Sequence, residues 1–201
     1  MENIMTLNRL KTKPNIKSLR VALAVTALIA LLGFAGYKLW GPPSPEAIRD
    51  RTIRALENRD AQTLCQLADP EELKRLNLTP QKVSAFLNET LWREGSLKKA
   101  KIEKFTPTPD DQSVWEVQWA TDKPKTPKLA ICCIDDPKKG WKLVTSYLLW
   151  STCWRKQKSK EGIKEYYALA QKHGIAGVRF QGGGYNNMAQ LEKMIKDVFK
   201  E

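Results

Sequence analysis

The chain has 201 residues and carries 34 lysine and arginine residues against 22 aspartate and glutamate residues, a formal net charge of +12 at pH 7. Residues 1–40 hold six basic residues and one acidic residue, which leaves 28 basic and 21 acidic residues, or +7, on the remainder. That remainder has the size of one ordinary domain, which argues against a second one, and its basic excess favours anionic partners without informing on the fold.

The first predicted element is a transmembrane helix over residues 21–40, because residues 21–37 carry no charge and a helix of this length crosses a bilayer core about 30 Å thick. Residues 1–20 form a leader with one acid, Glu2, and five basic residues: Arg9, Lys11, Lys13, Lys17 and Arg20. This bias predicts a bacterial single-pass protein of the plasma (inner) membrane, with a cytoplasmic N terminus and an extracytoplasmic C-terminal domain. A signal peptide cleaved before Gly36 is the alternative.

Residues 41–45 are rich in proline and predict a short stiff linker. An α+β domain over residues 46–154 follows, and its first half is expected to be helical. Four capping residues each precede a good first turn: Ser44, Asp60, Asp69 and Thr79. The first helix is amphipathic, the next two are short, and the fourth covers residues 81–93.

From residue 97 the hydrophobic period changes to two, which predicts strands over residues 97–105, 113–121, 128–134 and 141–154. Their short polar connections imply antiparallel neighbours, so we expect a curved antiparallel sheet of about four strands. Centring the loops pairs Val117 with Cys132 and Ile134 with Trp141. In this register Glu116 points to solvent, while one face packs against helices; that face carries Trp115, Trp119, Ala130, Cys132, Ile134, Trp141 and Tyr147.

Residues 155–201 are expected to form a helical extension. One helix covers residues 160–173 and ends at Gly174, and another covers residues 188–199, with Asn187 as its cap and Gln190 as the reciprocal partner. Between them lies a glycine-rich segment, residues 181–185. It lacks the Lys-Ser/Thr of a phosphate-binding loop and is interpreted as a connector.

The four cysteines, Cys65, Cys132, Cys133 and Cys153, lie in the part expected outside the cytoplasm, where disulfides persist. Cys132 and Cys133 are neighbours in one strand and project to opposite faces, so a bond from Cys65 to Cys132 or to Cys153 is favoured. The chain has no pair of C-x-x-C units and only one histidine, His173. We therefore expect neither a metal site nor a cofactor.

The order of the predicted elements resembles that of the nuclear-transport-factor-like (NTF-like), SnoaL-like superfamily with its cystatin-like cone fold. This order is an amphipathic helix, two short helices, a longer helix and then an antiparallel sheet. The resemblance covers residues 44–154 and rests on this order and on one aromatic face. It implies a pocket between the sheet and the first helices, lined by Trp115, Trp119, Trp141 and Tyr147. The family includes enzymes and also anchored domains that bind or scaffold, so the fold alone does not choose between them.

The candidate catalytic groups have ordinary structural interpretations. His173 lies in the C-terminal extension, and the pairs Asp110-Asp111 and Asp135-Asp136 lie in predicted turns, where aspartate bonds the local backbone. We therefore predict an extracytoplasmic binding or assembly module that is not an enzyme. The alternative is a small hydrolase or isomerase that uses the cone cavity.

The expected partners are a lipid bilayer for residues 21–40, and a protein partner or a second copy for the outer domain. A third hypothesis is a basic tether for an anionic polymer. Its contact residues would be Arg155, Lys156, Lys158 and Lys160, which follow Trp150 and Trp154. No specific nucleic-acid recognition is expected.

Overall fold

The structure, a computed structural model, describes residues 43–108, 112–121, 127–157, 160–180 and 184–198. Residues 42–201 make up one compact unit. The predicted leader and transmembrane segment lie outside the described residues. Among the helices that are described, none combines the length and the apolar composition needed to span a bilayer.

The first half of the unit is helical, as predicted. It contains α2 (Pro45–Glu57), α3 (Ala61–Leu67), α4 (Pro70–Arg75), α5 (Pro80–Glu89) and the short 3-10 helix η1 (Trp92–Glu94). Each predicted cap accepts a hydrogen bond from a first-turn N–H: Ala47 to Ser44, Thr63 to Asp60, Glu71 to Asp69 and Lys82 to Thr79. Local side-chain chemistry therefore sets where these four helices begin.

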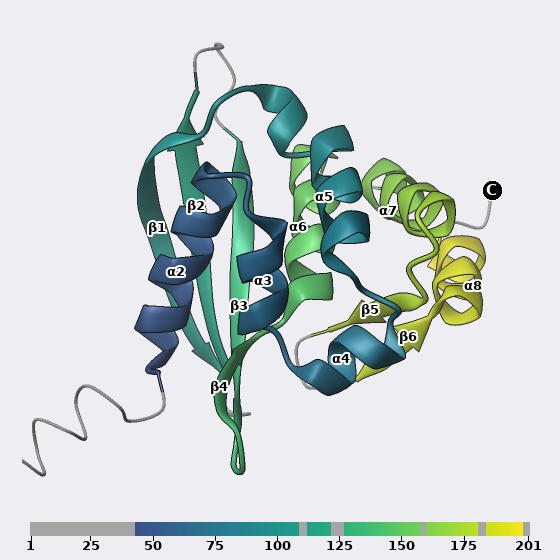
Figure 1. The fold of residues 1–201 in the computed structure, drawn as a ribbon. Coiled ribbons are helices and arrows are strands. Elements are labelled where there is room, and N and C mark those ends of the chain that lie inside the picture. Colours follow the sequence, from purple (N-terminus) through teal and green to yellow (C-terminus); the bar gives the residue numbers. More distant parts are fainter. Residues whose placement is uncertain (1–42, 109–111, 122–126, 158–159, 181–183, 199–201) are drawn as a thin grey trace, which may run out of the picture. The chain divides into compact units, whose positions relative to one another are not determined.

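The sheet has four antiparallel strands in the order β1-β2-β3-β4. The strands are β1 (Lys98–Thr108), β2 (Gln112–Ala120), β3 (Lys128–Asp136) and β4 (Gly140–Leu143). Figure 1 shows α2 and α3 lying over one face of this sheet. The predicted α+β class, with helices packed on a four-stranded antiparallel sheet, is confirmed.

The predicted register was wrong. Trp115 lies opposite Ile131 and Val117 opposite Leu129, and in the next pair Cys133 lies opposite Leu143. A shift by an odd number of residues exchanges the two faces of a strand. The residues of β3 that join the main core are therefore Leu129, Ile131 and Cys133, and not Ala130, Cys132 and Ile134. Residues 129–133 are all buried, so hydrophobicity could not indicate which face of β3 meets the helices.

The prediction of a strand over residues 141–154 was wrong beyond Leu143, where β4 ends and α6 (Thr145–Gln157) begins. The buried carboxylate of Glu72 accepts hydrogen bonds from the N–H groups of Thr145 (3.2 Å) and Ser146 (2.9 Å) and so caps this helix. Most of residues 145–153 are buried, so the segment has no polar stripe and its aromatic and β-branched residues imitate a strand.

Helix α6 lies beside β3, along the edge of the sheet that β4 leaves open (Figure 1). The Ser151 hydroxyl accepts a hydrogen bond from the Ala130 N–H at 3.1 Å, and the Val144 N–H donates to the Cys132 carbonyl at 2.9 Å. Helix α6 and the residue that precedes it thus satisfy strand groups that a longer β4 would otherwise pair.

The C-terminal part contains α7 (Lys160–Lys172), β5 (Gly177–Arg179), β6 (Tyr185–Asn187) and α8 (Met188–Val198). Both predicted helices are present, and Asn187 and Gln190 exchange the predicted capping bonds, at 2.9 and 2.8 Å. The antiparallel hairpin of β5 and β6 was not predicted. It flanks the glycine-rich segment, of which residues 181–183 lie outside the described residues.

Candidate functional site

The four aromatic residues predicted to line a pocket are placed as follows. Trp115 and Trp119 are 2% and 0% exposed and belong to the main core, and the Trp119 Nε1–H donates to Glu57 at 3.2 Å. Trp141 on β4 and Tyr147 on α6 are half-buried and pack against the same core. None of the four lines the cavity described next.

A cavity of about 290 Å³ lies against the β3–β4 hairpin. The residues that line it include three with carboxylates and three with cationic side chains, although most of the exposed lining surface is apolar: Asp69, Asp135, Asp136, Lys138, Lys142, Arg179, Ile134 and Pro137. The formal charges of the lining residues therefore cancel. Within the described residues, no group of three or more His, Cys, Asp and Glu side chains could hold a metal ion.

Three segments that are distant in the sequence build this cavity. Asp69 is the N-cap residue of α4, Arg179 ends β5, and the other lining residues belong to the β3–β4 hairpin. Asp69 Oδ2 lies 3.5 Å from Arg179 Nη1, and Asp69 Oδ1 lies 3.4 Å from Lys139 Nζ. The Asp69 and Arg179 side chains are only 12% and 11% exposed. Their mutual contact is long, which leaves capacity on both for a further partner.

Arg179 is held from two sides. Its backbone N–H donates to Ser146 Oγ at 2.9 Å, and its guanidinium carbon lies 5.1 Å from the centre of the Tyr185 ring, which Arg75 also approaches at 4.3 Å. The Arg179 Nε is buried and has no hydrogen-bond partner among the described residues. A guanidinium carries five N–H donors in a rigid fork, and this Nε–H is unsatisfied, while the exposed 11% of the side chain is the part that a ligand can reach.

Behind the cavity, Glu72 is fully buried, and its Oε1 also accepts a hydrogen bond from Ser146 Oγ at 2.5 Å. Burial raises the pKa of Glu72, against the opposing effects of the bonds from Ser146 and Thr145 and of the Arg179 charge. Both carboxylate oxygens are engaged in capping α6. Glu72 therefore acts as a structural group that connects, through Ser146, to the backbone of Arg179.

All four cysteines are buried thiols, and the disulfide suggested from Cys65 to Cys132 or Cys153 is not formed in the structure. Cys132 and Cys133 project to opposite faces, as predicted, since they belong to different core clusters. Burial, together with the Glu72 charge, raises the pKa of Cys65 to about 11 and that of Cys132 to about 12. These thiols stay protonated near neutral pH and are poor nucleophiles.

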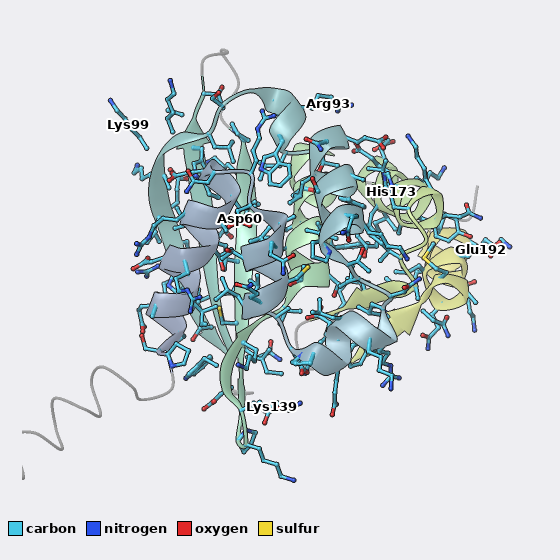
Figure 2. All side chains as sticks on the ribbon, viewed as in Figure 1. Asp60, Arg93, Lys99, Lys139, His173 and Glu192 are labelled. Atoms are coloured by element: carbon cyan, nitrogen blue, oxygen red, sulfur yellow. The ribbon has the colours of Figure 1, made fainter. Side chains whose placement is uncertain are left out.

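His173 follows α7 and lies far from the hairpin, whose tip carries Lys139 (Figure 2). Its Nε2 is 2.8 Å from Glu89 Oε1, and Lys172 Nζ is 2.7 Å from Glu89 Oε2. Hydrogen bonding from Lys172 and His173, although opposed by desolvation, lowers the pKa of Glu89. This cluster ties α5 to α7 and does not contribute to the cavity.

Asp136 has the turn role predicted for it, because its Oδ1 accepts from the N–H groups of Lys138 (2.8 Å) and Lys139 (3.1 Å). These bonds lower its pKa and keep it ionised beside the cavity. Glu116, expected to face solvent, is half-buried. The pair Asp110-Asp111 lies outside the described residues.

The basic tether candidates also lie outside what is described. The side chains of Arg155, Lys156 and Lys160, and Lys158 as a whole, belong to the residues that the structure does not describe. Contact between these residues and an anionic polymer stays a prediction.

Sequence reasoning missed the cavity. Asp69 was identified only as a helix cap, and Arg179 was not singled out. The available signal was the short run of residues 178–180 followed by glycines and Tyr185, which is the pattern of a hairpin. Even with that signal, the meeting of Asp69, Arg179 and the β3–β4 hairpin depends on tertiary packing.

No family model matches this sequence, and no curated protein is similar to it. A solved structure from Campylobacter jejuni, described as an NTF2-like transpeptidase, is similar over 50% of this chain and 97% of its own. The two share 16% sequence identity, with a TM-score of 0.39. Its description names the kind of fold that the element order resembles, but at these values the similarity supports no conclusion about family or activity.

Proposed function

We propose that this protein is a membrane-anchored binding module whose extracytoplasmic domain holds a small charged ligand without transforming it. The observation that carries the proposal is the cavity beside the β3–β4 hairpin, where charged side chains from three distant segments converge. Such convergence of polar groups on a concave surface is typical of ligand sites. The order of the elements is the basis for assigning the domain to the NTF-like cone fold.

Binding is favoured over catalysis because the reactive groups near the cavity have other roles. The Cys65 and Cys132 thiols have raised pKa values, and Glu72 caps α6. Asp136 bonds to its own turn. The Ser146 hydroxyl does contact the Glu72 carboxylate, but both residues are fully buried and Glu72 caps α6, so this pair lacks the accessible nucleophile that covalent catalysis needs.

Binding is tested by thermal unfolding of the full chain in detergent, against a panel of sugars, anions, amines and zwitterions. A compound that occupies the cavity raises the melting temperature, because a ligand of the native state stabilises it by mass action. The same compound should lose its effect in Asp135→Asn, and keep it in Asp50→Asn, which alters an aspartate on α2 away from the cavity. A panel without any stabilising compound, or a shift that Asp135→Asn leaves intact, would contradict the proposal.

The membrane anchor rests on the uncharged residues 21–37 behind the basic leader. We expect the full-length chain to stay in the membrane during carbonate extraction, and its intact mass to include the leader. We also expect protease added to spheroplasts to digest the domain after residue 41. Release of a shortened chain would favour the signal peptide, and protection of the domain would reverse the topology.

A further inference from the structure

We propose that the cavity beside the β3–β4 hairpin binds a zwitterion, with Arg179 receiving a carboxylate and the aspartates receiving an ammonium group. A free amino acid and the end of a short peptide both present this chemistry. The inference rests on the proposed binding function and names its class of ligand.

The formal charges of the residues that line the cavity balance one another. There are three carboxylates and three cationic groups, so a ligand with a net charge would upset this balance. Partly buried charges are stable only when they are paired. An anion such as phosphate would be repelled by Asp69 and Asp135, and an amine by Arg179. A molecule with both charges and no net charge complements the whole lining.

The environment of Arg179 favours a carboxylate as its ligand. Its side chain is 11% exposed, its Nε has no hydrogen-bond partner among the described residues, and its Nη1 reaches Asp69 only at 3.5 Å. A carboxylate can accept two parallel hydrogen bonds from one guanidinium fork. The Tyr185 ring and the bond from the Arg179 backbone to Ser146 fix the position of this fork. Arg179 is therefore prepared to bind a planar oxyanion.

The contacts of Lys139 show where an ammonium group fits. Its ammonium group lies 3.4 Å from Asp69 Oδ1, 3.7 Å from Glu71 Oε1 and 4.0 Å from Asp136 Oδ2. An ammonium group is thus already accommodated among these carboxylates, on a side chain that is 38% exposed. Contacts of this length on an exposed lysine are weak, so a ligand ammonium can take over the contact with Asp69.

The size of the cavity suits a small ligand. A volume of about 290 Å³ is at the lower end of the range for small-molecule sites, about 300–1,000 Å³. This volume suits a single amino acid or a peptide end. Ile134 and Pro137 supply apolar surface for the part of the ligand between or beside the two charges.

The test is calorimetric titration of the full chain in detergent with L-alanine and with alanyl-alanine, against propionate, ethylamine and inorganic phosphate at equal ionic strength. At least one of the two zwitterions should bind, and each single-charge analogue should bind at least about tenfold more weakly. Binding by alanine alone assigns the free amino acid, and binding by the dipeptide alone assigns a ligand with separated termini.

Two substitutions assign the roles. Arg179→Lys keeps the charge but removes the fork and should weaken zwitterion binding by about tenfold or more. Arg51→Lys, at an exposed position of α2, is the matched control and should leave binding unchanged. If Arg179→Lys fails to fold, Asp135→Asn keeps the test decisive, because it should weaken alanine binding while strengthening propionate binding.

The outcomes separate this inference from the proposed function. Phosphate, propionate or ethylamine binding as tightly as alanine would overturn the zwitterion and leave a binding module in place. Stabilisation by an uncharged compound that Asp135→Asn abolishes would overturn both the zwitterion and the charged ligand of the proposed function, and would leave only binding at this cavity. Absence of binding by every compound of the panel would overturn both.

Discussion

The residues that cap helices in this protein lie at two very different sequence separations from the helices they cap. Ser44, Asp60, Asp69, Thr79 and Asn187 cap helices that begin at the next residue, and each could be read from a local pattern. Glu72 caps a helix that begins 73 residues later in the chain. No local sequence pattern indicates such a cap, and the start of α6 could therefore not be predicted.

The buried Glu72 should make stability depend on pH. Burial raises its pKa in the folded chain above the ordinary value of 4.5, so between these two values the folded state holds a proton that the unfolded state has lost. Its stabilising contribution is therefore complete below 4.5 and is lost as the pH rises through the raised pKa. The slope within that window is at most about 1.4 kcal/mol per pH unit.

Urea unfolding at a series of pH values compares the wild type with Glu72→Gln. The substitution should remove this contribution to the slope and cost about 1–3 kcal/mol, because the amide NH₂ opposes a backbone N–H of α6. Glu71→Gln, at a neighbouring side chain that is 81% exposed, should retain the wild-type slope. A wild-type slope in Glu72→Gln would show that Glu72 does not titrate in this window.

At the scale of elements, periodicity located the amphipathic α2 and the paired β1 and β2 where the structure has them. Periodicity failed for α6 and gave the wrong face of β3, because both segments are buried on more than one side. The β5–β6 hairpin was missed for another reason: its strands have only three residues each, too few for an alternating pattern.

The β5–β6 hairpin positions Arg179, so distorting it should disturb the cavity. Gly177 has φ of +151° in this hairpin, and a Cβ there would collide with the Asn186 carbonyl and lie 2.9 Å from Asn187 Cα. Gly177→Ala should therefore cost about 1–3 kcal/mol of stability and weaken ligand binding. Gly184→Ala is the control, because a Cβ at that position meets nothing within 4 Å. Equal ligand affinities in these two variants would show that the β5–β6 hairpin does not shape the binding site.

At the scale of the whole molecule, the class of fold follows from the order of helices and strands, whereas the candidate site does not. Asp69 and Arg179 are 110 residues apart, and only the packed unit brings them together. The sequence also suggested that residues 155–201 are an extension of the domain over residues 46–154. In the structure Tyr166, Val178 and Leu191 belong to the same buried core as the sheet residues.

A core that is shared in this way should unfold in one step. Leu191 on α8 is fully buried, and Leu191→Ala should lower the free energy of unfolding by about 2–5 kcal/mol, whereas Lys193→Ala at an exposed position should change it by less than about 0.5 kcal/mol. All seven tryptophans precede residue 155, and in a Trp150→Phe background, which removes the indole ring that contacts Tyr166 and Phe180, their fluorescence reports on the rest of the chain. If residues 155–201 are integral, Leu191→Ala shifts the fluorescence transition together with the far-UV circular dichroism transition. A circular dichroism transition that moves alone would show that the extension folds separately, and Arg179 could then leave the cavity while the sheet stays intact.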